Sequence, residues 1–473
     1  MVGITSYGAH IPMHRLTREE IGRANGTRGG KGEKAICGFD EDSLTMAVAA
    51  SVDCLKGIDR KVVDGLYLAT TTAPYVEKMI STTAAAALDL RAEIATLDLT
   101  NALRAGTGAL LCAANAVKAG AMKNVLVAAA DCRLVESKSE LEPVLGDGAA
   151  ALLVGDTNVL AEIEDSYSVS DEFMDLWRTY GDKYVRIWED RFAVDTGYMR
   201  VVPQTVSALL GKKNVKIENL TKVLFYAPNE RRFAELGKRL KLQPEQFPTQ
   251  VLSSIGNTGT ALPFMLLIEA LEQAKADDRL LLVGFGNGCD AVLLRVTAEI
   301  EKLKGKRLGI KGSLAARRAE LTYQTYMQWR ELVTLAPLPR PSPARTPVPE
   351  MWRDRSQNLA LCGAKCRKCG TQQYPVQRVC VGCHAKDEFD LVRLSDKKAT
   401  IFTFTNDNLS PSPNPPASVA VVDFDGGGRW TFDVTDRDPN ELKVGMAVEP
   451  TFRRLNTAYG IHNYWWKVKP ASA

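Results

Sequence analysis

The sequence predicts two kinds of fold in one chain, a layered α/β domain followed by a β-rich domain. Over the first 300 residues, short apolar strands alternate with helical segments, which is the pattern of an α/β fold. Six prolines among residues 336–349 then interrupt this pattern with a stiff, extended linker. Beyond the linker, segments such as ASVAVVDF at 417–424 alternate apolar and polar residues, as half-buried strands do.

The α/β part contains a repeated unit. Residues 101–120 and 256–274 are both apolar helical stretches, rich in small residues, with Asn and Gly near their starts. Each is followed by an apolar strand, at 124–132 and 279–289, and then by a second one, at 149–155 and 291–296. Helices that are apolar on every face are expected to lie buried between layers. The repeat therefore predicts an internally duplicated fold of five layers, with two ordinary buried helices as the alternative.

These patterns divide the chain into four segments. Residues 1–300 form the α/β domain, and residues 301–349 hold a helix, indicated by the spacing over 314–333, and the proline-rich linker. Residues 350–392 are expected to contain a short helix and a metal-binding ribbon. Residues 393–473 are expected to form a five-stranded all-β barrel of the OB-fold type.

Composition and charge restrict the possible partners. The chain has 60 basic and 56 acidic residues, and this near balance argues against nucleic acid as the main partner. No apolar run approaches the length of a membrane-spanning helix, and the first residues lack the pattern of a signal peptide. We therefore expect no membrane association and a cytoplasmic location.

Four of the ten cysteines have the spacing of a metal site. Cys366, Cys369, Cys380 and Cys383 form two CxxC pairs separated by ten residues. Two such turns supply four soft ligands in tetrahedral geometry, so the spacing predicts a closed, structural zinc site. Cys362 and His384 lie nearby and are expected to be bystanders. The other cysteines are scattered, which suits reduced thiols in a cytosolic protein.

Several motifs of the first domain resemble those of the bacterial and archaeal hydroxymethylglutaryl-CoA synthase family. They are GITSYGAHIP at 3–12, GFDED at 38–42, GDGAA at 146–150, DLWR at 175–178, GNTG at 256–259 and GFGNG at 284–288. The resemblance implies a five-layered thiolase fold, a homodimer and an acyl-CoA thioester as substrate, with coenzyme A as part of that substrate. Residues 349–470 are similar to the zinc-ribbon/OB-fold proteins (domain of unknown function 35) that accompany such thiolases.

The positions that carry acyl transfer in that family are changed here. The nucleophilic cysteine of the family falls at Leu103, which cannot carry an acyl group. Tyr226 replaces the general-base histidine, and Thr71 stands where an acidic residue is expected. Asn257 remains at the position that hydrogen-bonds the thioester oxygen in related enzymes, as does the glycine turn with Gly286 and Gly288. The binding and oxyanion positions are therefore retained, whereas the acyl-transfer groups are missing.

Three functions fit this pattern. The first is a carbon–carbon lyase that cleaves a β-hydroxyacyl-CoA with Tyr226 as acid/base and Asn257 as oxyanion donor. It resembles the thiolase-fold steroid side-chain aldolases, which lack the usual cysteine and work with a zinc-ribbon/OB partner. The second is a non-catalytic acyl-CoA-binding scaffold for a second thiolase-type subunit, since drift in a pseudoenzyme would change the same positions. The third is residual acyl transfer by an unrecognised nucleophile.

Overall fold

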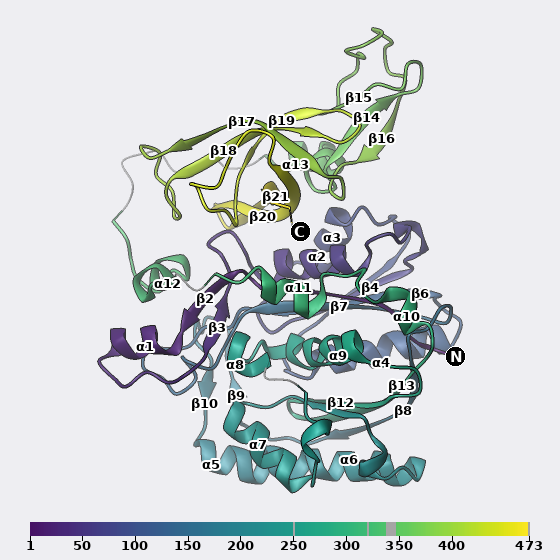
Figure 1. Ribbon diagram of the computed structural model, residues 1–473, viewed down its shortest axis with the longest axis vertical. Coiled ribbons are helices and arrows are strands. Elements are labelled where there is room, and N and C mark those ends of the chain that lie inside the picture. The colour runs from purple at the N-terminus through teal and green to yellow at the C-terminus, as the bar shows by residue number, and fades with distance from the viewer. Residues whose placement is uncertain (249–250, 319–320, 337–346, 472–473) are drawn as a thin grey trace. The chain divides into compact units, whose positions relative to one another are not determined.

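The computed structural model describes residues 1–248, 251–318, 321–336 and 347–471 (Figure 1). The chain forms two compact units. The first comprises Met1–Cys37, Asp42–Ser81 and Ala92–Tyr326, and the second comprises Met327–Ala473 with the short segments Gly38–Glu41 and Thr82–Arg91. Most of the proline-rich linker lies outside the described residues, so the expected boundaries at 300, 349 and 392 stay predictions.

A nine-stranded mixed sheet organises the first unit, in the order β11-β12-β13-β8-β1-β7-β6-β4-β5. Its strands are β1 (Gly3–His10), β4 (Gly65–Ala69), β5 (Ala95–Leu99), β6 (Asn124–Asp131), β7 (Gly148–Gly155), β8 (Ala161–Ser170), β11 (Lys222–Phe225), β12 (Arg279–Phe285) and β13 (Gly288–Val296). Every residue of β7 is buried, which explains why this strand is a continuous apolar run rather than an alternating one.

The sheet consists of two matching halves, as the duplication predicts. In the first half, β4 runs parallel to β6, β6 antiparallel to β7, and β7 antiparallel to β1. In the second half, β11 runs parallel to β12, β12 antiparallel to β13, and β13 antiparallel to β8. The halves meet where β1 pairs with β8 over two residues only. The same unit is therefore used twice around a central junction.

Five helices complete the layers: α2 (Ser43–Cys54), α4 (Ala105–Lys118), α6 (Met199–Lys213), α9 (Leu262–Gln273) and α11 (Gly309–Ala315). Helices α4 and α9 contact strands of both halves and lie side by side in the middle of the unit (Figure 1). Helices α2 and α11 pack on the first half, and α6 packs on the second. A methyl group on Gly106 would come within 2.6 Å of the Thr260 carbonyl oxygen, so small residues allow α4 its close approach. The predicted five-layered thiolase fold is confirmed.

The prediction of one helix over residues 314–333 is wrong. The structure has two shorter helices, α11 ending at Ala315 and α12 (Tyr323–Trp329). Between them the backbone of Arg318 adds to the edge of β2 (His14–Thr17), where its N–H donates to Met13 and its carbonyl accepts from Arg15. Pairing with a strand satisfies these backbone groups in place of helical hydrogen bonds, which local spacing cannot reveal.

The second unit contains the predicted ribbon and barrel. The ribbon is a three-stranded sheet of β14 (Cys362–Cys366), β15 (Gln372–Gln373) and β16 (Phe389–Arg393). The barrel has the order β19-β18-β17-β20-β21, with β17 (Ala399–Asp407), β18 (Ala417–Phe424), β19 (Arg429–Asp433), β20 (Ala447–Ala458) and β21 (Ile461–Pro470). A parallel bridge between Val434 and Val468 links the end of β19 to β21 and closes the barrel.

No helix in the described part of the chain is long and apolar enough to cross a membrane.

Candidate functional site

Leu103 lies just before the first turn of α4, beside the turn that joins β12 to β13. The backbone conformation of Gly286, with φ of +154°, brings this turn close to Leu103. A Cβ atom at Gly286 would be 2.9 Å from the Leu103 nitrogen and 3.2 Å from the Leu103 Cβ. The turn is fixed further because Arg104 donates to Asp290 of β13 over 2.9 Å. The fold therefore places these two predicted pocket residues together.

A cavity of about 290 Å³ lies in front of Leu103. Three of the four predicted pocket residues line it: Thr71, Leu103 and Gly286. The fourth, Gly288, packs instead against β8, where a Cβ atom would meet the Val169 carbonyl oxygen at 2.1 Å. The other lining residues are Asn101, Ala102, Arg133, Met174, Asp175, Leu176, Trp177, Arg178, Val185 and Asn287.

Thr71 is held in this wall by a buried carboxylate. Asp131, at the end of β6 and fully buried, accepts from the Thr71 backbone N–H over 2.7 Å and from its hydroxyl over 3.0 Å. The same carboxylate accepts from the Thr70 and Thr72 hydroxyls and from the Thr260 backbone N–H. Thr71 therefore donates to the protein itself, and Asp131 joins the loop after β4 to the start of α9.

Tyr226 and Asn257 are in direct contact. Both are buried, and the Asn257 side-chain amide donates to the Tyr226 hydroxyl oxygen over 3.0 Å. The amide also donates to the carbonyls of Ala227 and Pro228, at 3.0 and 3.2 Å. Asn257 is therefore fully used in holding the segment around Tyr226, and the hydroxyl proton of Tyr226 is left to be donated elsewhere.

Burial controls the ionisation of Tyr226. Loss of water around the phenol raises its pKa above 10.0, and the Arg133 guanidinium and the Asn257 hydrogen bond only partly oppose this. The negative charge of Asp175 raises the pKa of Tyr226 further. Tyr226 therefore stays protonated at neutral pH and can act as a hydrogen-bond donor.

Arg133 extends the same hydrogen-bonded group. One of its guanidinium nitrogens donates to the Asn257 side-chain oxygen over 2.8 Å and to its backbone oxygen over 3.3 Å. Its Nε atom is buried without a hydrogen-bond partner among the residues the structure describes. A buried guanidinium with unused donor capacity can bind an oxyanion or a carbonyl oxygen.

A second cavity, of about 60 Å³, lies beside Tyr226 and Asn257. Its wall is mainly apolar, with Leu141, Leu145, Leu176, Ile187, Trp188, Ala193, Val194, Pro228 and Phe285 among its residues. It shares Arg133, Asp175 and Leu176 with the cavity in front of Leu103, so the two cavities adjoin. Arg133 and Asp175 were not predicted as site residues. The only signal for Asp175 was its place in the DLWR motif.

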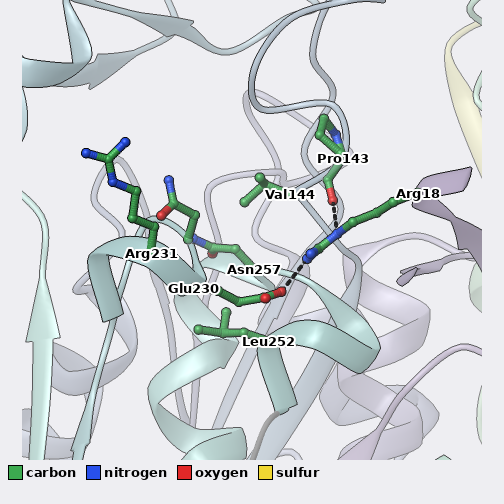
Figure 2. Close-up of a pocket in the computed structure, with 8 residues that line it drawn as sticks. Arg18, Pro143, Val144, Glu230, Arg231, Leu252 and Asn257 are labelled. Carbon is green, nitrogen blue, oxygen red and sulfur yellow. Dashed lines mark hydrogen bonds and ion pairs between the residues drawn. The ribbon is translucent and has the colours of Figure 1, made fainter. Parts of the chain in front are cut away.

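A third cavity, of about 320 Å³, is also lined by Asn257 (Figure 2). Arg18 borders it, donating to the Pro143 carbonyl over 3.1 Å and forming an ion pair of 2.6 Å with Glu230. Arg231 borders it as well. Asn257 lines both this cavity and the one beside Tyr226, so each cavity shares lining residues with the next, from the two arginines to Leu103. We call this arrangement the cavity row.

The cavity row offers no cysteine or histidine among its described lining residues. Of these described lining residues, only Thr71 and the tyrosines carry a hydroxyl group, and the Thr71 hydroxyl donates to Asp131. The walls do supply groups for hydrogen bonding and proton transfer, among them Arg133, Asp175 and Tyr226.

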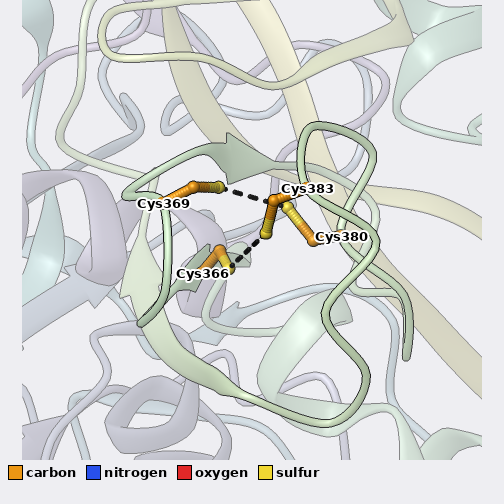
Figure 3. Close-up of side chains that lie close together, drawn as sticks. All are labelled: Cys366, Cys369, Cys380 and Cys383. Atoms are coloured by element: carbon orange, nitrogen blue, oxygen red, sulfur yellow. Dashed lines mark hydrogen bonds between the residues drawn. The ribbon is translucent and has the colours of Figure 1, made fainter.

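The four predicted zinc ligands converge in the second unit (Figure 3). Their sulfur atoms all lie within 4.8 Å of one another. The sulfurs of Cys366 and Cys383 are 3.7 Å apart, and those of Cys369 and Cys380 are 3.5 Å apart. Tetrahedral zinc with bonds of about 2.3 Å requires sulfurs about 3.8 Å apart, and these two pairs lie near that distance. Cys362 and His384 do not belong to the cluster.

Comparison with protein families agrees with both units. Residues 97–171 match the 3-oxoacyl-[acyl-carrier-protein] synthase III family, and residues 210–296 match the C-terminal domain of that synthase. Residues 359–389 match the rubredoxin-like zinc ribbon domain of ChsH2, and residues 391–453 match its C-terminal OB-fold domain.

Individual proteins of known family are similar to the first unit. Hydroxymethylglutaryl-CoA synthase of Methanocaldococcus jannaschii is 31% identical over 347 residues, covering 71% of this chain and 100% of that protein. The synthase of Pyrobaculum arsenaticum is 31% identical, covering 71% of this chain and 99% of that protein. Among solved structures, MvaS in complex with 3-hydroxy-3-methylglutaryl coenzyme A has a TM-score of 0.63 at 22% identity, covering 72% of this chain and 94% of that one. The chain therefore belongs to the hydroxymethylglutaryl-CoA synthase family and carries a zinc ribbon and an OB fold after the family's domain.

Proposed function

We propose that this protein is a carbon–carbon lyase that cleaves a β-hydroxyacyl-CoA thioester. One observation carries the proposal: the cavity row has a hydrogen-bonded group of Tyr226, Asn257 and Arg133 but no cysteine or histidine among its described lining residues. Retro-aldol cleavage needs a proton acceptor and donors that stabilise a thioester enolate, and it needs no covalent acyl-enzyme.

In this proposal Tyr226 is the donor to the thioester oxygen. Its oxygen already accepts a hydrogen bond from Asn257, so its own proton is available for the developing enolate oxygen. The sequence suggested Asn257 as the oxyanion donor. Because its amide is directed to Tyr226 and to two backbone carbonyls, we assign Asn257 the role of positioning Tyr226 and Arg133.

Coenzyme A is proposed to enter from the cavity that Arg18 and Arg231 border. These guanidinium groups now pair with Glu230 and Glu235 and would exchange these carboxylates for phosphate, and Asn257 lines the same cavity (Figure 2). The solved relatives include a synthase complexed with CoA, at a TM-score of 0.63. The apolar cavity beside Tyr226 suits the carbon skeleton of the acyl group.

Synthesis of hydroxymethylglutaryl-CoA is the second candidate, because the relatives carry that name. The usual route requires a cysteine at position 103, which is leucine. A non-catalytic acyl-CoA scaffold is the third, since all three acyl-transfer positions have changed.

The test is incubation of the full chain with a panel of β-hydroxyacyl-CoAs, with detection of the released aldehyde or ketone. Tyr226→Phe keeps the ring and removes the hydroxyl that donates to the enolate oxygen, so binding should persist while turnover falls about 10²–10³-fold. The denatured wild-type protein should carry no acyl label. Tight acyl-CoA binding without cleavage of any panel member would favour the scaffold, and a labelled protein would favour acyl transfer.

Two further assignments accompany this function. We propose one structural zinc ion per chain at Cys366, Cys369, Cys380 and Cys383, where it would stabilise a ribbon too small to bury a core. We also propose a homodimer that forms along β5. This strand is one edge of the nine-stranded sheet, and its Leu97 is 40% exposed, so its outer side can pair with a second copy.

A further inference from the structure

Asp175 has an unusual position for an acidic residue. It precedes β9 (Leu176–Trp177), which pairs with β10 (Arg186–Ile187). Its backbone carbonyl accepts from the Trp188 N–H over 3.1 Å, and its Oδ1 atom accepts from the Leu176 N–H over 2.6 Å. No side chain in the described part of the structure donates to this carboxylate or forms an ion pair with it. The carboxyl group is thus fixed in place by backbone alone.

Asp175 belongs to the walls of two cavities of the cavity row. It lines the cavity that contains Tyr226 and also the cavity that contains Leu103. Of the described residues, only Arg133 and Leu176 do the same, and neither is an acid or a base at neutral pH. A thioester held beside Tyr226 would therefore occupy a cavity that Asp175 also lines.

We infer that Asp175 is the proton-transfer residue of this site. The assignment rests on the proposed lyase function. The Asp175 carboxylate takes the proton of the substrate β-hydroxyl group while the Cα–Cβ bond breaks. The electron pair of that bond moves to the thioester as an enolate, whose oxygen accepts from Tyr226, and the β-carbon becomes an aldehyde or ketone. Asp175 then returns its proton to Cα, so the products are a shorter acyl-CoA and a carbonyl compound, with no external reactant.

The electrostatics of the walls support this division of roles. Burial raises the pKa of Asp175 above the usual 3.8, opposed by the backbone N–H groups that it contacts. An acid whose pKa is raised toward neutrality accepts a proton more readily in the reaction. The charged and titratable groups that share its two cavities are Arg133, Arg178, Asp190, Tyr198 and Tyr226. Since burial keeps Tyr226 protonated and the charge of Asp175 reinforces this, Tyr226 donates and Asp175 accepts.

The test compares Asp175→Asn with the wild-type full chain. The amide oxygen can still accept from Leu176, but the side chain can no longer take a proton. Cleavage should fall about 10²–10⁴-fold, with the dissociation constant of a saturated acyl-CoA changed less than about threefold. The acid limb of the wild-type pH profile, expected above pH 3.8, should be lost in the residual activity. Formate should partly restore cleavage to Asp175→Ala, which a purely structural role would not allow.

Asp195→Asn is the matched control. Asp195 lies in the neighbouring helical turn with a side chain 60% exposed, and its ion pair is to the exposed Arg191. It lines none of the three cavities. This variant should cleave at the wild-type rate. Asp175→Asn cleaving at that rate with an unchanged pH profile would overturn the assignment.

A second measurement separates this assignment from the lyase function. In D₂O, the reverse of the last step exchanges the α-protons of a saturated acyl-CoA, and mass spectrometry detects the deuterium. Exchange that depends on Asp175 without cleavage of any β-hydroxyacyl-CoA would reject the lyase and keep Asp175 as the base. Cleavage that is independent of Asp175 would reject Asp175 alone. Neither cleavage nor exchange by the wild-type protein would reject both.

Discussion

The zinc ribbon and the cavity row bring their functional groups together in opposite ways. In the ribbon, two short turns of neighbouring chain carry all four thiols, and the spacing alone determines which atoms meet. In the cavity row, Leu103, Asp175, Tyr226 and Asn257 come from distant parts of the chain, and only the fold makes them neighbours. The chemistry of a local motif can therefore be read from its spacing in the sequence. A site assembled from distant residues can instead lose its cysteine nucleophile and keep the hydrogen bonds among its other residues.

Removal of one thiol from the zinc ribbon should have the largest effect on stability. Cys366→Ser removes one of four ligands, so zinc should be lost and the ribbon should unfold, because metal binding supplies about 10–16 kcal/mol in small zinc domains. Zinc analysis of the purified protein and proteolysis of the second unit measure this. Cys362→Ser is the control and should retain one zinc per chain. A full complement of zinc in Cys366→Ser would show that the four-thiol assignment is wrong.

Loss of the buried Asp131 carboxylate, which holds the loops beside the cavity row, should have a smaller effect on stability. Asp131→Asn places an amide among several buried donors that face the carboxylate, so some of them lose their partner. The free energy of unfolding of the first unit should fall by about 2–5 kcal/mol. Urea denaturation measures it, with Asp277→Asn as the control, since that side chain is 88% exposed. An unchanged midpoint in Asp131→Asn would mean that the loops are held by other contacts.

The same contrast explains what the sequence could predict. The duplicated halves, the ribbon and the grouping of Thr71, Leu103 and Gly286 follow from local patterns or from the family resemblance. Arg133 and Asp175 were missed because an arginine after a strand or an aspartate before one is ordinary until the fold places it in two cavities. The helix over 314–333 was wrong because pairing of Arg318 with a distant strand outweighed its helical spacing.

A third test asks whether one chain is enough to assemble the site. The Ala95 N–H donates toward β4, so the Thr96 N–H faces the outer edge of β5. Thr96→Pro removes that outer donor and should shift the protein from a dimer to a species of 51.7 kDa in light scattering. Thr96→Ala should remain dimeric. No residue of β5 lines the cavity row, so the monomer should retain acyl-CoA binding. A wild-type protein of 51.7 kDa would contradict the dimer.

Restoring the missing nucleophile should have the smallest effect, although it reverses the most conspicuous change in the sequence. In Leu103→Cys the thiol would lie at the start of α4, where the helix N-terminus favours a thiolate. Acyl transfer also needs a base near that thiol, yet position 226 is a buried tyrosine that stays protonated, and Thr71 donates its proton to Asp131. We therefore expect no synthesis of hydroxymethylglutaryl-CoA from acetyl-CoA and acetoacetyl-CoA. Chromatography of the products measures this, and mass spectrometry of the protein reports any acyl label at position 103. Synthase activity in this single variant would mean that the assembled site lacks only its thiol and that the lyase proposal assigns Tyr226 wrongly.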